Sequence, residues 1–71
     1  MPRWAQAIKE YRTALRLDPN DGDTHNNLGV ALERNGDLRA ALEEYRKACT
    51  LDPKDATYES NFRRLSQQVD K

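Results

Sequence analysis

The feature that most constrains the fold of this chain is an internal repeat with a period of 34 residues. Six of the identities at this one offset are Ala7 with Ala41, Tyr11 with Tyr45, Ala14 with Ala48, Leu17 with Leu51, Asp18 with Asp52, and Pro19 with Pro53. Self-similarity at a fixed period is typical of repeat architectures, in which each unit buries its apolar face against its neighbours. We therefore expect a stack of similar units.

Apolar residues within each unit recur every three or four positions, which is the spacing of one face of an α-helix. Four such stripes occur, and no segment shows the alternation of a β-strand. The stripes are Trp4, Ala7, Ile8, Tyr11, Ala14 and Leu15; Leu28, Ala31 and Leu32; Leu38, Ala41, Leu42, Tyr45, Ala48, Cys49 and Leu51; and Tyr58, Phe62, Leu65 and Val69. The pattern predicts four helices and an all-α fold.

Turn and capping residues separate the predicted helices. The first helix is expected to end near Leu17, because Pro19 disfavours helical geometry at the residue before it. Each later helix follows an aspartate that can cap its first turn. These caps are Asp21 or Asp23, then Asp37, then Asp55, and the second helix is closed by Asn35 or Gly36 in the left-handed conformation of a C-terminal cap.

Gly29 lies inside the second predicted helix, where glycine costs roughly 0.5–1 kcal/mol relative to alanine. This cost is offset if another part of the chain packs against the bare backbone. Ala41 and Ala48 are also small and lie on the apolar face of the next helix. We therefore expect the helix backbones to approach closely at these three residues.

At these residues the chain resembles the tetratricopeptide repeat family, whose 34-residue helix-turn-helix unit follows the pattern W-x2-L-G-x2-Y and then A, F or Y, A and P. The matching residues are Leu28, Gly29, Ala41, Tyr45, Ala48 and Pro53. His25 stands where the family often has tryptophan, and Leu32 replaces an aromatic residue. The resemblance implies an all-α, tetratricopeptide-type stack of helical hairpins, coiled as a right-handed superhelix of four helices.

The resemblance treats residues 1–71 as one domain with three parts. Residues 2–18 match the second helix of an incomplete repeat, residues 22–55 a complete repeat, and residues 56–70 the first helix of another. Arg63 falls 34 residues after Gly29, and a bulky charged residue there opposes the approach of a further helix. Residues 56–70 are therefore expected to be a C-terminal capping helix. The chain can alternatively be a fragment of a longer tetratricopeptide repeat protein.

The resemblance also implies a concave groove that binds a peptide or a partner helix. Asn27 and Asn61 are 34 residues apart and each precedes an apolar contact residue, Leu28 or Phe62, so both are expected to point into the groove. An asparagine amide can bind a peptide N–H and C=O together, and the family uses asparagine there in this way. A merely solvated or capping role for the pair stays open. Further groove candidates are Asp23, Asn26, Val30, Glu33, Arg34, Thr57, Ser60, Arg64 and Gln68.

Other interaction classes can be compared with this groove. Trp4, Ile8 and Tyr11 lack the first helix of their own repeat, so we expect an exposed apolar patch of about a few hundred Å² that favours a homo-oligomer.

Family members that grip the carboxylate tails of heat-shock chaperones use basic residues where this chain has Thr57 and Asn61, which argues against that ligand. An RNA-binding helical repeat is disfavoured by the 34-residue period and by the charge balance of 12 basic and 12 acidic residues.

The composition argues against several other functions. Balanced charge provides no general attraction to nucleic acid or to anionic membranes. Cys49 is the only cysteine and His25 the only histidine, which excludes an intrachain disulfide and leaves too few ligands for a structural zinc site. We expect both residues to pack in the fold, and we predict no enzyme activity, no cofactor and no metal. The chain has no membrane-length apolar run and no signal-peptide core, which favours a soluble, cytoplasmic protein.

Overall fold

A computed structural model describes residues 3–69, which form four α-helices and no strand. The helices are α1 (Trp4–Leu17), α2 (Gly22–Arg34), α3 (Leu38–Leu51) and α4 (Ala56–Val69). The predicted all-α class and the four predicted helices are therefore confirmed.

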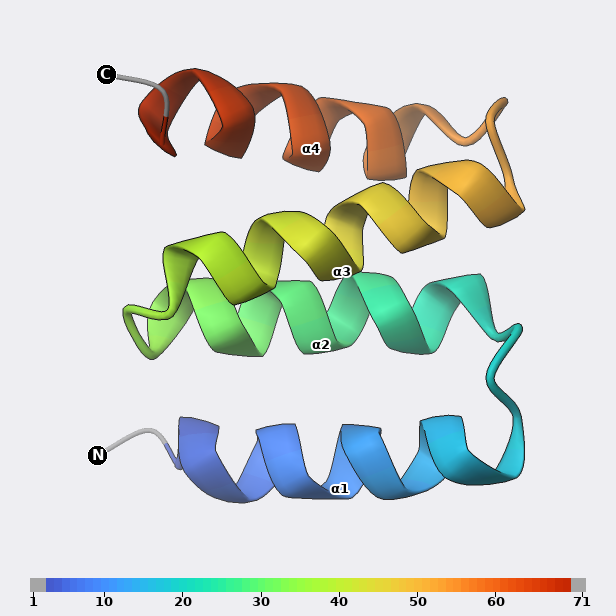
Figure 1. Cartoon of the computed structure of the whole chain (residues 1–71), viewed down its shortest axis with the longest axis vertical. Coiled ribbons are helices and arrows are strands. Elements are labelled where there is room, and N and C mark those ends of the chain that lie inside the picture. The colour runs from blue at the N-terminus through green and yellow to red at the C-terminus, as the bar shows by residue number, and fades with distance from the viewer. Residues whose placement is uncertain (1–2, 70–71) are drawn as a thin grey trace.

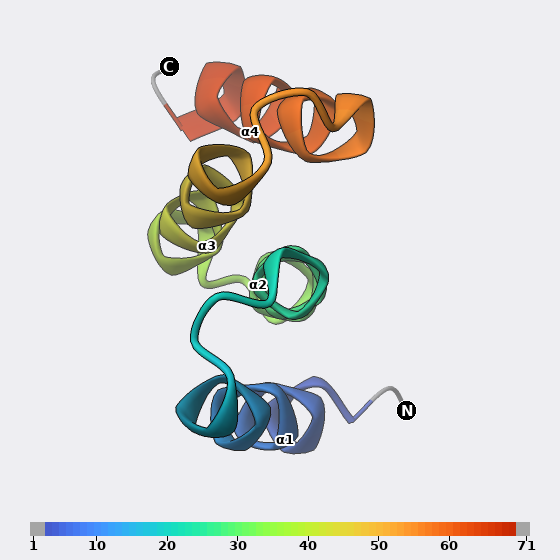
Figure 2. The same ribbon diagram turned by 90° about the vertical axis from the view of Figure 1, so that its right-hand side faces the viewer.

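The helices stack in chain order, and consecutive helices run in opposite directions (Figure 1). α2 packs on α1 and more extensively on α3, and α3 packs on α4. Viewed end-on, α3 is displaced to one side, whereas α2 and α4 share the other side of the stack (Figure 2). The four helices form a slab with extents of 27 × 27 × 15 Å, so most residues lie close to a surface.

Two of the predicted aspartate caps form as expected. The Asp21 carboxylate accepts a hydrogen bond from the Thr24 backbone N–H at 3.2 Å and so caps α2. The Asp55 carboxylate accepts from the backbone N–H groups of Thr57 and Tyr58 at 2.9 and 3.1 Å. These bonds satisfy donors that a helix N-terminus otherwise leaves unpaired.

The turn between α2 and α3 is closed by backbone hydrogen bonds. Gly36 has a φ of +91°, which favours glycine, whereas Asn35 is in the right-handed helical region. The Gly36 N–H donates to the Glu33 carbonyl at 3.1 Å and the Asp37 N–H donates to the Leu32 carbonyl at 2.9 Å, which is the pairing of a Schellman motif. The predicted side-chain cap by Asp37 is wrong, because its carboxylate accepts instead from the Asn35 amide at 3.0 Å.

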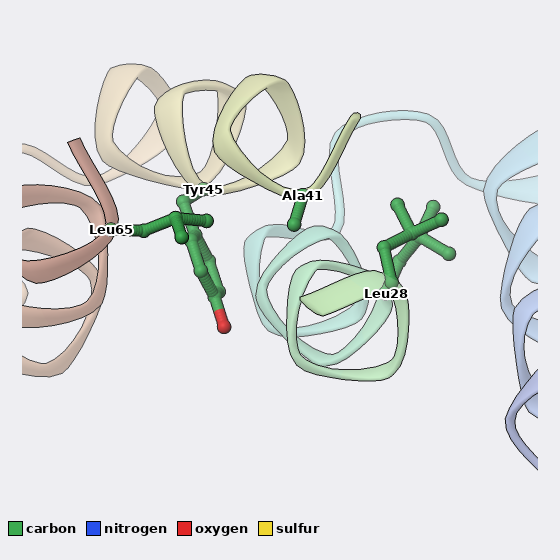
Figure 3. Packing of buried hydrophobic residues seen from close by; sticks show 5 residues of the cluster. Leu28, Ala41, Tyr45 and Leu65 are labelled. Atoms are coloured by element: carbon green, nitrogen blue, oxygen red, sulfur yellow. The ribbon is translucent and has the colours of Figure 1, made fainter. Parts of the chain in front are cut away.

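The core lies between α2, α3 and α4, and α1 contributes no fully buried residue. Figure 3 shows Ala41 directed at α2 and the Tyr45 ring beside Leu65 of α4. A Cβ atom at Gly29 would lie only 2.6 Å from the Cδ1 and Cε1 atoms of Tyr45. Gly29 therefore makes room for an aromatic ring. The sequence had instead suggested a close approach of two helix backbones at this residue.

Candidate functional site

Three polar side-chain pairs connect α2 to α4 along the shared side of the stack. They are Asp23 with Tyr58, Asn26 with Asn61, and Glu33 with Arg64. We refer to these six residues as the α2–α4 seam. Although α3 separates the two helices in sequence, the seam holds α2 and α4 at a fixed spacing.

The first two pairs of the seam each join a buried side chain to a more accessible one: Tyr58 and Asn26 are buried, whereas Asp23 is exposed and Asn61 is half-buried. The Tyr58 hydroxyl donates to the Asp23 carboxylate, and Tyr58 is only 6% exposed. This hydrogen bond, together with burial, raises the pKa of Tyr58. The Asn61 amide donates to the Asn26 side-chain oxygen at 3.1 Å, and Asn26 is 9% exposed. These side chains are therefore engaged in holding α2 and α4 together.

Glu33 is the centre of the third pair and joins three helices. Its carboxylate accepts two hydrogen bonds from the Arg64 guanidinium, at 2.5 and 2.8 Å, and one from the Tyr45 hydroxyl at 2.8 Å. The Arg64 bonds, followed by the Tyr45 bond, lower the pKa of Glu33. Burial and the Glu33 carboxylate raise the pKa of Tyr45. The arrangement fixes Arg64 on the concave surface while leaving half of its side chain exposed.

A concavity of about 460 Å³ lies beside the Glu33 pair. It brings together five of the predicted groove residues and one further side chain, that of Tyr45. The lining residues are Val30, Glu33, Arg34, Tyr45, Asn61 and Arg64. Both arginines are exposed, and the charge of Arg64 is paired with the Glu33 carboxylate, so the concavity combines charged groups with a partly apolar floor.

Asn27 and Asn61, which are predicted to point into the groove from equivalent positions, differ in their contacts. Asn27 is exposed, and Asn61 is bonded to Asn26. Residues 34 apart occupy the same position in their own helices, so they point in parallel directions. The cross-helix pairs Asn26–Asn61 and Asp23–Tyr58 have a sequence separation of 35. Asn26, expected on the groove surface, is therefore mostly buried in the seam, and a role for Asn27 in peptide binding stays a prediction.

The residues predicted for self-association are less exposed than we expected. Trp4, Ile8 and Tyr11 are half-buried, and Ile8 and Tyr11 pack against the core. The Arg34 guanidinium lies 5.6 Å from the centroid of the Trp4 ring, within the range of a cation–π contact. Because α2 covers one side of α1, these residues are only partly exposed, and their role in self-association stays a prediction.

His25 is held between two oxygen acceptors in the interior. Its Nδ1 lies 2.7 Å from a Glu44 carboxylate oxygen and its Nε2 lies 2.8 Å from the Pro19 carbonyl oxygen. His25 and Glu44 are 7% and 9% exposed. His25 thus links the α1–α2 turn to α3, and Glu44 is a partner that sequence reasoning missed.

A family model described as tetratricopeptide repeat matches residues 3–56. The chain therefore belongs to the tetratricopeptide repeat family, whose repeats generally mediate protein–protein interactions. A comparison with curated proteins finds no significant match. Within residues 3–69, no helix combines the length and apolar character needed to span a bilayer. The same residues contain no group of three or more side chains suited to holding a metal ion.

Proposed function

We propose that this chain is a protein-interaction module that binds a peptide or a partner helix on the concave side of α2 and α4. The observation that carries the proposal is the concavity beside the seam, in which Val30 and the exposed Arg34 and Arg64 side chains converge. Recognition sites combine apolar side chains with directed polar groups, and Val30 and the Tyr45 ring supply the apolar part here. We assign the module no catalytic role.

The exposed arginines supply the polar part of this recognition. Arginine donates paired hydrogen bonds to carboxylate and carbonyl oxygens. Arg64 is already oriented by Glu33 at 2.5 and 2.8 Å, so little side-chain freedom is lost when a ligand binds. Asn27 and the oxygen of Asn61 add groups able to bind a peptide backbone. Asp23 and Asn26 contribute by holding α4 in place.

The proposal can be tested by capturing partners, mapping the bound segment to a synthetic peptide, and titrating that peptide. Arg34→Ala should weaken binding by roughly tenfold, because a charge-assisted hydrogen bond contributes about 1.5–3 kcal/mol. Asn27→Ala should cost roughly fivefold. Arg39→Ala is the matched control, since Arg39 is exposed on α3 and lies outside this concavity. Equal affinities for all four proteins would contradict the proposed site.

Self-association is a second candidate, supported by the 85% exposure of Leu17 at the end of α1. A homo-oligomer formed through α1 should dissociate to monomer in Trp4→Gln and Leu17→Gln, as measured by sedimentation velocity over a range of concentrations. A wild-type chain that stays monomeric at high micromolar concentration would reject this candidate. We also propose the cytoplasmic location that the sequence favours.

A further inference from the structure

A second surface of the chain, away from the concave site, is rich in positive charge. A concavity of about 330 Å³ lies where α1 and α3 flank α2. Arg12 and Arg16 of α1 and Lys47 of α3 line it, and all three residues are exposed. We call these three residues the basic cluster. The concavity shares no lining residue with the one beside Glu33, so the two surfaces are separate.

The positive charge of the basic cluster is only partly neutralised by the chain itself. Within residues 3–69, no ion pair involves Arg12 or Arg16. Among the described residues that line the concavity, Glu44 has the only carboxylate. Its oxygens lie 2.7 Å from His25 and 3.5 Å from Lys47. The two guanidinium groups of α1 are therefore able to bind an anion from outside the chain.

The equivalent positions of α3 show that this lack of pairing is particular to α1. Arg46, which is 34 residues after Arg12, pairs with Glu43 at 2.5 Å. In α1 the position equivalent to Glu43 is occupied by Lys9. Lys9, Arg12 and Arg16 are spaced by three and four residues, so they lie on one face of the helix. α1 therefore presents a row of cations where α3 presents an ion pair.

The accessibility of the two arginines does not depend on what covers the outward face of α1. α3 is packed between α2 and α4, yet Arg46 and Thr50, the counterparts of Arg12 and Arg16, are exposed. Such positions lie on the side of the stack, and neighbouring helices do not bury them. A further helix packed on α1 would leave both arginines accessible in the same way.

The shape of this surface suits a chain of several residues better than a small anion. The concavity adjoins a second one of about 640 Å³, since Arg12 lines both. Apolar side chains line each of them, with Leu15 and Leu28 in the first and Leu32 and Leu38 in the second. A ligand that fills both needs apolar groups as well as negative charge.

We infer that this surface binds an acidic peptide segment of a partner protein, in which carboxylates flank an apolar side chain. The carboxylates pair with the guanidinium groups of Arg12 and Arg16, whose geometry matches them, and the apolar side chain contacts Leu15. The second concavity contains both Arg39 and Asp37, so the acidic residues of the peptide gather at the first. The choice of partner follows from charge complementarity and is independent of the proposed concave site.

A nucleic acid fits this surface less well. The chain has 12 basic and 12 acidic residues, whereas affinity for a phosphate backbone grows with the number of phosphates that are neutralised. The basic cluster provides three cations, and the leucines beside it have no counterpart in a phosphate backbone. The two kinds of ligand can be compared directly in one experiment.

The test is to titrate the ¹⁵N-labelled chain with the synthetic peptide Glu-Asp-Leu-Glu-Glu-Leu-Asp-Glu. The expected chemical-shift changes are at Arg12, Leu15, Arg16 and Lys47. The peptide in which glutamine and asparagine replace the acidic residues should produce none. A short oligothymidine should bind more weakly than the acidic peptide at the same salt concentration.

Charge-neutralising variants locate the binding surface. The double variant Arg12→Gln, Arg16→Gln should weaken binding of the acidic peptide about tenfold, and Lys47→Gln about threefold. The matched control is the double variant Lys54→Gln, Arg63→Gln, which removes the same charge at exposed positions outside both concavities. Its affinity should stay within about twofold of wild type.

Arg34→Gln separates this surface from the concave one and should also stay within about twofold. Absence of binding by the acidic peptide, equal losses in the two double variants, or shifts centred on Arg34 and Arg64 would each overturn the inference. Tighter binding of the oligothymidine would overturn it by assigning the basic cluster to a nucleic acid.

Discussion

The two ends of the stack present different outward faces. At the α1 end, Ala14 is exposed and Leu17 is 85% exposed. At the α4 end, Glu59 and Arg63 form an ion pair, with 54% and 67% of their side chains exposed. Apolar surface gains free energy when another helix covers it, whereas a charged pair must first lose its hydration. The outward side chains of a terminal helix therefore decide whether a stack can be extended there.

The largest expected effect separates the interior helix from the end helix. Tyr45→Ala should lower the free energy of unfolding by about 3–5 kcal/mol, because it removes a fully buried aromatic ring. Tyr11→Ala, at the equivalent position of α1, should cost less than about half as much, because Tyr11 is only half-buried. Urea denaturation, monitored by circular dichroism, measures the free energy of unfolding of both variants. Similar losses would mean that α1 and α3 are packed alike.

A smaller effect is expected where a side chain is added to the close contact. Gly29→Ala should destabilise the chain by about 1–3 kcal/mol despite the better helix propensity of alanine, because the new Cβ lies 2.6 Å from the Tyr45 ring. Arg63→Ala, at the equivalent position of α4, should change stability by less than about 0.5 kcal/mol. A stabilised Gly29→Ala protein in thermal unfolding would show that the contact is loose.

The carboxylates of the interior and the end should also differ in their response to pH. The Arg64 and Tyr45 bonds lower the pKa of Glu33. The stability that these bonds give to the folded chain is therefore fully present above the unfolded-state pKa of Glu33, and it is lost as the pH falls through the folded-state pKa. Glu33→Gln should therefore cost about 1–2 kcal/mol at pH 7. This difference should shrink below roughly pH 4.

Glu59→Gln is the control for this comparison, because it removes an exposed ion pair of α4. It should change the unfolding free energy by less than about 0.5 kcal/mol at either pH. Denaturant titrations of the three proteins at pH 7 and pH 3 provide the comparison. A Glu33→Gln cost that is the same at both pH values would argue against the charged hydrogen bonds of Glu33.

The smallest expected effect concerns the exposed leucines at the ends of equivalent helices. Leu17 and Leu51 are 85% and 41% exposed. Leu17→Gln should leave the unfolding free energy within about 0.5 kcal/mol of wild type, and Leu51→Gln should cost slightly more because it loses more buried surface. A larger loss of unfolding free energy for Leu17→Gln than for Leu51→Gln, measured by urea denaturation, would indicate that Leu17 is buried in solution.

The sequence predicts the helices and their stacking well because both depend on local or strictly periodic signals. The 34-residue offset, the three-to-four spacing and the aspartates before helices identify all four elements. Gly36 is one of the two residues predicted to close α2, and its φ of +91° agrees with that expectation. Asp37 is an exception, since whether an aspartate caps a helix depends on competing partners such as the Asn35 amide.

The site is less predictable because its contacts do not follow the repeat offset. Arg64 binds Glu33 across a separation of 31 residues, and Asn61 binds Asn26 across 35. Such pairs depend on the angle and spacing between α2 and α4, which a 34-residue alignment does not contain. The sequence likewise does not predict the contact between Trp4 and Arg34, because this contact depends on which side of α1 is covered by α2.

The central claim is that equivalent faces of α1 and α3 differ in accessibility, and thiol labelling tests it most directly. Ala14→Cys and Ala48→Cys are compared in a Cys49→Ser background at pH 7.5 with a maleimide reagent. The account predicts that the α1 cysteine reacts at the rate of an unfolded peptide and that the α3 cysteine reacts at least about 100-fold more slowly. Equal labelling rates in folded proteins would contradict it.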